Sequence, residues 1–112
     1  KLDFVGVMTM EFFATADGPL FNEMAPRVHN SGHWTIEGAA TSQFENHIRA
    51  VCNLPLGATE LVAERVEMAN LIGADADRWP MLFADNDAHV HLYGKGQASP
   101  GRKMGHVTRL YR

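Results

Sequence analysis

The chain has 112 residues, and 46% of them are apolar, so it is long enough for one ordinary domain with a hydrophobic core. The 10 basic and 13 acidic residues give a net charge of −3, which argues against a nucleic-acid-binding surface. The single cysteine, Cys52, excludes an internal disulfide, and no apolar run reaches the roughly 18 residues of a membrane span. We therefore expect a cytoplasmic protein that binds neither nucleic acid nor membrane. Because the first residue is Lys1 rather than methionine, we also expect the natural protein to extend upstream.

The first two predicted elements form a β-hairpin. Residues 4–15, FVGVMTMEFFAT, are apolar on both faces and rich in Val, Phe and Met, which favours a central strand over a surface helix. The sequence ADG at 16–18 is typical of a turn, and a second run, PLFNEMAP, follows at 19–26.

The length of the hairpin loop decides which side chains share a face. If the loop is 16–18, Thr15 pairs with Pro19, and Glu11 lies opposite Glu23. A two-residue loop at 17–18 would place the two acids on opposite faces. The sequence alone leaves both registers open.

A loop and a helix follow. Residues 27–39, RVHNSGHWTIEGA, contain two glycines and no period, which predicts a long ordered loop of the kind that often carries function. The next residues, Ser42 to Glu45, match a capping box, and Phe44, Ile48 and Val51 recur at helical spacing. We expect one helix there.

The last third of the chain predicts more strand than helix. Residues 61–73 could form a helix by composition, but they also allow a strand with alternating polar positions, which we favour. Residues 75–84 predict a short helical turn interrupted by Pro80. The segment AHVHLYGK at 88–95 alternates like a half-exposed strand, and 101–112 closes the chain as another. The fold class is therefore α+β.

Two acids in the hairpin are candidate metal ligands. In the first register Glu11 and Glu23 face each other between apolar strands, where like charges repel and are costly to desolvate. A divalent cation would relieve the repulsion. Asn22 adds a neutral oxygen, and hard oxygen ligands suit Mg²⁺. The alternative is that Glu11 lies at a sheet edge and Glu23 forms an ordinary ion pair with Arg27.

The loop after Pro26 is a candidate anion site. Arg27, His29, Asn30 and Ser31 bring a guanidinium, an imidazole, an amide and a hydroxyl close together, a set that would bind a carboxylate or bicarbonate. The alternative is that these side chains only satisfy the backbone of their own loop.

A third cluster lies near the carboxyl end. Lys95, Arg102 and Lys103 flank a glycine-rich loop, which would suit a phosphate monoester, although a solvated hairpin tip has the same composition. His89 and His91 share a strand face and are compatible with a zinc pair, but no third ligand has an obvious spacing.

Residues 6–57, which include the specific motif NEMAPRVHNSGHWT, together with PGRKMGH at 100–106, resemble the carboxyl-terminal part of the N5-carboxyaminoimidazole ribonucleotide synthetases of the ATP-grasp superfamily. The resemblance covers nearly the whole chain but only the last part of the family's length. It implies that residues 1–56 are the end of an ATP-grasp domain and that residues 57–112 are a small β-rich carboxyl-terminal domain. The family's amino-terminal domain and its ATP-clamp lysine have no counterpart here.

The resemblance also implies an activity, an ATP-dependent ligase of purine biosynthesis that carboxylates 5-aminoimidazole ribonucleotide with bicarbonate through carboxyphosphate. It assigns roles residue by residue: Glu11 and Glu23, with Asn22 beside them, to Mg²⁺ and ATP; Arg27, His29, Asn30 and Ser31 to bicarbonate and carboxyphosphate; Lys95, Arg102 and Lys103 to the ribonucleotide's 5′-phosphate.

The chain taken alone is expected to be inactive, because the remaining parts of the nucleotide site are absent from it. The alternative is a non-catalytic binding or oligomerisation module derived from an ATP-grasp enzyme. A partial sheet exposes strand edges and apolar surface, which predicts a homodimer.

Overall fold

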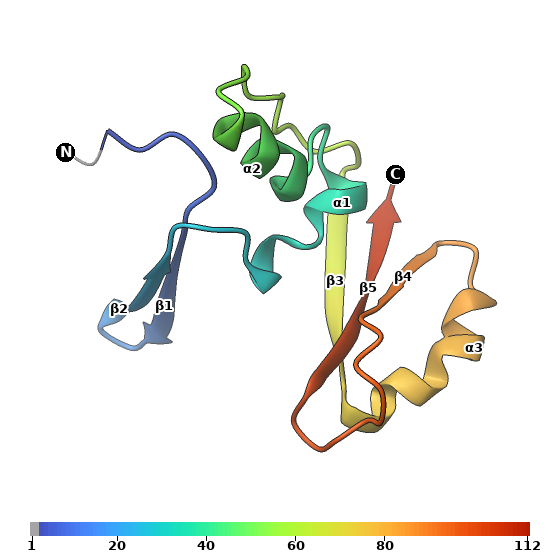
Figure 1. The fold of residues 1–112 in the computed structure, drawn as a ribbon. Helices are drawn as coiled ribbons and strands as arrows, with labels where there is room; N and C mark the ends of the chain where they lie inside the picture. Colours follow the sequence, from blue (N-terminus) through green and yellow to red (C-terminus); the bar gives the residue numbers. More distant parts are fainter. Residues whose placement is uncertain (1–2) are drawn as a thin grey trace. The chain divides into compact units, whose positions relative to one another are not determined.

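The computed structural model describes residues 3–112, which form two compact units that divide between Glu60 and Leu61. The sequence placed this division between residues 56 and 57. The first unit contains β1 (Thr9–Thr15), β2 (Gly18–Ala25), the 3₁₀ turn η1 (Asn30–Gly32), α1 (Thr35–Gly38) and α2 (Gln43–Val51). The second contains β3 (Arg65–Ile72), the 3₁₀ turn η2 (Gly73–Arg78), α3 (Trp79–Phe83), β4 (Ala88–Leu92) and β5 (Lys103–Tyr111) (Figure 1).

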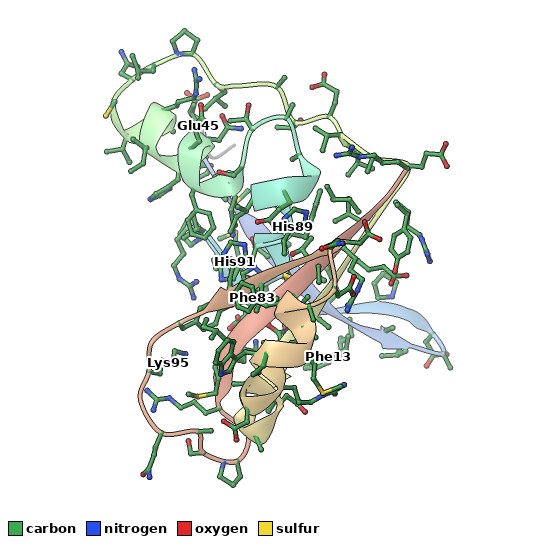
Figure 2. All side chains as sticks on the ribbon, turned by 90° about the vertical axis from the view of Figure 1, so that its right-hand side faces the viewer. Phe13, Glu45, Phe83, His89, His91 and Lys95 are labelled. Atoms are coloured by element: carbon green, nitrogen blue, oxygen red, sulfur yellow. The ribbon has the colours of Figure 1, made fainter. Side chains whose placement is uncertain are left out.

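β1 and β2 form a two-stranded antiparallel hairpin. β1 begins at Thr9 rather than at residue 4, because Thr9 pairs with Ala25, the last residue of β2. The prediction of a central, buried strand is wrong for the described residues. Most hairpin side chains are exposed, including Phe13, which Figure 2 labels on β1, since no third strand of residues 3–112 pairs with this sheet.

The segment after the hairpin is more regular than the sequence predicted. Residues 27–39 contain η1 and the single helical turn α1 in place of a loop without elements. Side-chain hydrogen bonds stabilise these turns, so no hydrophobic periodicity in the sequence indicates them. His29 caps η1 by accepting from the amide of Ser31, and the Thr35 hydroxyl donates to the carbonyl of Gly32 over 2.6 Å.

The helix predicted from the capping box is confirmed as α2. Ser42 is its N-cap, with the hydroxyl accepting from the backbone N–H of Glu45 over 3.2 Å. The Glu45 side chain pairs with Arg49 one turn later at 2.7 Å, so only the Ser42 half of the box is shown. The helix ends where Asn53 takes a left-handed conformation, φ 54°, a common helix terminus.

The second unit is built on a three-stranded antiparallel sheet in the order β3-β5-β4 (Figure 1). All three predicted strands are confirmed. β5 occupies the centre, which explains why its middle residues are the most buried of the chain, with Val107 at 3% and Thr108 at 0% exposure. Leu71 of β3 and Met104 complete the apolar core.

The connection from β3 to β4 corrects one prediction. Pro80 does not interrupt a helix, because it lies in the first turn of α3, where its missing N–H has no intrahelical partner to lose. η2 precedes it, and Gly73 at φ 53° begins η2 in a left-handed conformation that favours glycine.

An ion pair ties the turn before β4 to the central strand. Arg109 of β5 donates to Oδ2 of Asp85 through Nη2 at 2.9 Å and through Nε at 3.1 Å. The other carboxylate oxygen accepts from the backbone N–H of Asp87 at 3.1 Å. The Arg109 hydrogen bonds, and then the Asp87 amide, hold the pKa of Asp85 below its ordinary 3.8.

This contact predicts acid-sensitive stability. A depressed folded-state pKa contributes stability above the unfolded value of 3.8, and the contribution is lost as pH falls through the folded pKa. The difference in melting temperature between wild type and Asp85→Asn should therefore be constant from neutral pH to about pH 5 and shrink below pH 4. Thermal unfolding followed by circular dichroism measures it, and a difference independent of pH would contradict the assignment.

Candidate functional site

A bulge in the hairpin brings the two candidate metal ligands together. The loop contains only Ala16 and Asp17, because Thr15 pairs with Gly18 and not with Pro19. Continued regularly, this register would place Asn22 opposite Glu11. The pairing shifts between Glu11 and Phe12, however, so that Glu11 faces Glu23. The structure thus pairs the two acids, as the first of the two registers considered from the sequence would have it, but neither of the two loops considered there is the one that forms.

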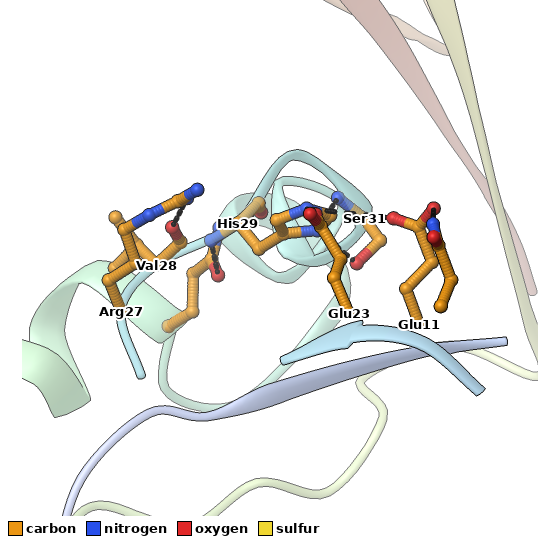
Figure 3. Close-up of polar contacts among 8 residues, drawn as sticks. Glu11, Glu23, Arg27, Val28, His29 and Ser31 are labelled. Atoms are coloured by element: carbon orange, nitrogen blue, oxygen red, sulfur yellow. Dashed lines mark hydrogen bonds and ion pairs between the residues drawn. The ribbon is translucent and has the colours of Figure 1, made fainter. Parts of the chain in front are cut away.

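The two carboxylates form the charged centre of a small polar cluster (Figure 3). Asn22, the bulged residue, donates its amide to Oε1 of Glu11 over 2.8 Å. The side chains of Glu11 and Glu23 are 45% and 57% exposed, so solvent reaches both. The imidazole Nε2 of His29 lies 3.9 Å from a carboxylate oxygen of each.

The ring of His29 is held by its own turn. Nδ1 accepts from the amide of Ser31 at 3.3 Å and lies 2.8 Å from the Ser31 hydroxyl. Because Nδ1 is an acceptor, the neutral ring carries its proton on Nε2, the atom that faces the two carboxylates. The ring therefore presents a donor toward the acids. Ligand atoms of Glu11, Glu23 and His29 all lie within 4.8 Å of one another, close enough for one metal ion.

Arg27 lies apart from this cluster. Its Nη1 donates to the carbonyl of Val28 over 3.0 Å, and Figure 3 shows the guanidinium on the far side of His29 from both glutamates. The alternative ion pair between Glu23 and Arg27 is therefore not formed among the described residues. Asn30 and Ser31 both belong to η1, next to His29. The structure brings His29 to the carboxylates, with Ser31 against the other side of its ring, but does not bring Arg27 there.

Sequence reasoning missed one residue of this region, Gln43. It begins α2, is only 8% exposed, and hydrogen-bonds both the backbone of His29 and the ring of His33. The capping-box pattern identified the helix start but gave no reason to examine this side chain. No sequence signal points to it, because its burial and its partners, 14 residues away, appear only in the folded chain.

The carboxyl-terminal cluster is organised around one loop of the second unit. Nζ of Lys95 donates to the carbonyl of Lys103 over 2.7 Å and lies 5.2 Å from the ring centre of Tyr93. Nη1 of Arg102 donates to the carbonyl of Lys95 over 3.4 Å. Lys95 lies on the loop that follows β4 (Figure 2), beside a cavity of about 190 Å³ that Trp79 and Met104 also line. The structure thus brings Lys95 and Arg102 into one loop network, with Lys103 contributing a carbonyl.

The two histidines of β4 have different neighbours. The ring of His91 stacks on that of His106 with centres 4.5 Å apart, and the hydroxyl of Tyr93 lies 2.8 Å from Nδ1 of His106. His89 instead lines a separate pocket with Asp87 and Tyr111. Among residues 3–112 no helix combines the length and apolar character needed to cross a membrane.

Two family models match the chain. The ATP-grasp domain matches residues 1–44, and the phosphoribosylaminoimidazole carboxylase C-terminal domain matches residues 67–112. The N5-carboxyaminoimidazole ribonucleotide synthase of Brucella melitensis is 56% identical over 97% of this chain and 30% of its own length. That of Pseudomonas aeruginosa is 56% identical over 96% of this chain and 29% of its own. The chain thus spans about 30% of the length of these relatives.

Solved structures agree with the sequence matches. The N5-carboxyaminoimidazole ribonucleotide synthetase of Thermus thermophilus superposes with a TM-score of 0.81 at 54% identity, covering 99% of this chain and 30% of that one. A synthase from Aspergillus clavatus, in complex with ADP and 5-aminoimidazole ribonucleotide, gives 0.82 at 41% identity, covering 94% and 30%. These matches confirm the resemblance predicted from the sequence: the chain is similar, over nearly its whole length, to the carboxyl-terminal part of the N5-carboxyaminoimidazole ribonucleotide synthetases, ligases of the ATP-grasp superfamily.

Proposed function

We propose that this chain is part of a ligase that carboxylates 5-aminoimidazole ribonucleotide to N5-carboxyaminoimidazole ribonucleotide with ATP and bicarbonate. The observation that carries the proposal is the pair Glu11 and Glu23, opposed across the hairpin, with the His29 ring 3.9 Å from both. The chain by itself is proposed to be inactive, because it spans about 30% of the relatives that bear this name.

Mg²⁺ fits the hairpin cluster. The cluster offers carboxylate oxygens from two facing side chains and an amide beside them, all hard oxygen donors that are open to solvent. Glu11 and Glu23 would hold the ion, and Asn22 would hold Glu11 in place. When bound, the ion neutralises charge on the ATP phosphates during phosphoryl transfer.

The loop at 27–31 is proposed to bind bicarbonate. His29 offers an N–H on the side of the acids, and the Ser31 hydroxyl contacts the same ring. Arg27 is exposed, and its bond to Val28 is a single backbone contact, so its guanidinium can turn toward an anion at little cost. Asn30 supplies a further amide. The role of His29 as a proton acceptor stays a prediction, because the neutral ring offers a donor at Nε2.

The proposed reaction proceeds in three steps. A bicarbonate oxygen attacks the γ-phosphorus, and the bond from that phosphorus to the ADP oxygen breaks, which gives carboxyphosphate and ADP. The carbon–oxygen bond of carboxyphosphate then breaks to give CO₂ and phosphate. The exocyclic amine of the ribonucleotide attacks CO₂ and loses a proton to form the carbamate. Donors from the 27–31 loop would stabilise the developing oxyanion, and a closed site would exclude water.

Lys95, Arg102 and Lys103 are proposed to hold the 5′-phosphate of the ribonucleotide. The bonds among Lys95, Arg102 and the Lys103 carbonyl keep two cations on one glycine-rich loop. Gly94, Gly96 and Gly101 all have positive φ, which lets the backbone approach an anion closely. A cytoplasmic location and a homodimer remain predictions. The exposed Phe12, Phe13 and Leu20 of the hairpin support an apolar interface.

One prediction from the proposed function concerns the metal. In the intact protein, Glu23→Gln should lower ATP-driven carboxylation by about 10²-fold or more, because one charged ligand of the ion is lost at the transferring phosphoryl group. Coupled ADP release at saturating substrate measures turnover. Glu45→Gln is the matched control, since Glu45 is also exposed but pairs with Arg49 on α2. Retained turnover in Glu23→Gln would sink the metal assignment.

Another prediction concerns the ribonucleotide phosphate. Arg102→Gln should raise the KM for 5-aminoimidazole ribonucleotide by about tenfold or more, because a charge-assisted hydrogen bond contributes roughly 1.5–3 kcal/mol. The KM for ATP should not change. Arg65→Gln serves as a control, since Arg65 pairs with Glu67 on β3. Equal KM values for the ribonucleotide in the two variants would count against the phosphate loop.

A further inference from the structure

The side chain of Gln43 hydrogen-bonds both the backbone N–H and the backbone carbonyl of His29. Its Oε1 accepts from the backbone N–H of His29 at 3.0 Å, and its Nε2 donates to the carbonyl of the same residue at 2.8 Å. Gln43 is 14 residues away from His29 in the sequence, and it is buried. A single buried amide therefore fixes the backbone of the residue whose ring faces the two carboxylates.

The same amide also orients a second histidine. Because the backbone N–H of His29 donates to one atom of the Gln43 amide, that atom must be the oxygen, Oε1. The other atom is then Nε2, which carries two hydrogens. One goes to the His29 carbonyl, and the other to Nδ1 of His33 at 2.8 Å. His33 must therefore accept at Nδ1 and carry its proton on Nε2. Every hydrogen of the Gln43 amide is used, which leaves it one orientation.

The surroundings are built closely around this amide. A Cβ on Gly32, in the turn after His29, would lie 2.5 Å from Oε1 of Gln43, so no larger residue fits there without moving the amide. The backbone N–H of Gln43 donates to the Thr35 hydroxyl at 2.9 Å, and that hydroxyl donates to the Gly32 carbonyl. Hydrogen bonds of Gln43 and its partner Thr35 thus join η1, α1 and α2.

We propose that Gln43 is a positioning residue for the loop at 27–31. Its amide holds His29 at the distance from Glu11 and Glu23 that turnover requires. The proposal rests on the proposed function. It assigns to Gln43 no contact with substrate. It predicts that loss of the amide lets the 27–31 loop shift, which lowers turnover while the metal ligands stay in place on the hairpin.

The chain contains a matched control on the same helix. Asn46 is also buried and clamps a peptide in the same way, since Oδ1 accepts from the Gly57 N–H at 2.8 Å and Nδ2 donates to the Gly57 carbonyl at 3.3 Å. This second clamp holds the segment after α2 and not the 27–31 loop. Variants at 43 and 46 each lose one buried side-chain amide of α2. They differ in the backbone that loses its hydrogen bonds, which is that of His29 in the first case and that of Gly57 in the second.

The clamp itself is tested by amide hydrogen exchange in the chain. Gln43→Met keeps the length of the side chain and removes its hydrogen bonds, and Asn46→Leu does the same at 46. Exchange at the His29 amide should rise by about tenfold or more in Gln43→Met and stay at the wild-type rate in Asn46→Leu, with the opposite result at Gly57. Equal rates at His29 in both variants would overturn the clamp.

The role in turnover is tested in the intact protein. Gln43→Met should lower kcat by roughly tenfold to a hundredfold, with the KM for ATP within twofold of wild type, because a small misplacement of a catalytic group is costly. Asn46→Leu should lower kcat by less than threefold when both variants are assayed well below their melting temperatures. Gly32→Ala, which crowds the amide, should behave like Gln43→Met and provides a second route if Gln43→Met folds poorly.

The outcomes separate this proposal from the function on which it rests. Equal kcat values for Gln43→Met and Asn46→Leu would overturn the positioning role, as would faster exchange at His29 with full activity. A wild-type intact protein without ATP-driven carboxylation would overturn the proposed function itself. That result is distinguishable, because the exchange measurement judges the clamp without any substrate.

Discussion

Two carboxylates of like charge face each other across one rung of a two-stranded sheet, and the residues around them must accommodate that repulsion. Glu11 and Glu23 are directly opposed, and a pair of this kind is unfavourable unless a positive group or a donor lies between. In the structure Nε2 of His29 points toward both and lies 3.9 Å from an oxygen of each, which is longer than a hydrogen bond. A cation held by the same oxygens would relieve the repulsion more fully. If the proposed cation binds there, the hairpin should become more stable when the site is occupied.

Three devices hold this geometry in place, and each is local. The bulge at Asn22 turns Glu23 onto the face of Glu11, and the Asn22 amide holds Glu11 by a hydrogen bond. Ser31 fixes which nitrogen of His29 faces the acids. The buried amide of Gln43 fixes the backbone beneath that ring. The hairpin, η1 and the start of α2 each supply one of these constraints. The cluster of Glu11, Glu23 and His29 therefore depends on all three elements.

The sequence predicts the elements of this chain better than their details, for physical reasons. Alternating patterns predicted β3 and β4, and the capping pattern at Ser42 predicted α2, because these signals arise within one element. The bulge was missed because it depends on pairing between two strands, so the sequence left open whether Glu11 faces Glu23 and considered neither the bulge nor the loop at 16–17. The turns η1 and α1 were missed because side-chain hydrogen bonds of His29 and Thr35, rather than periodicity, form them. The resemblance supplied the candidate roles, and no spacing rule could have pointed to Gln43.

The central claim is that bicarbonate is activated by phosphoryl transfer from ATP at the cluster of Glu11, Glu23 and His29. The most direct measurement is the fate of an oxygen label, with bicarbonate that contains ¹⁸O supplied to the intact protein together with ATP and 5-aminoimidazole ribonucleotide. Attack by a bicarbonate oxygen on phosphorus, followed by cleavage of the carbon–oxygen bond, must leave that oxygen on phosphate. The account predicts labelled inorganic phosphate, formed in wild type and lost in Glu23→Gln. Unlabelled phosphate from an active wild-type protein would contradict it.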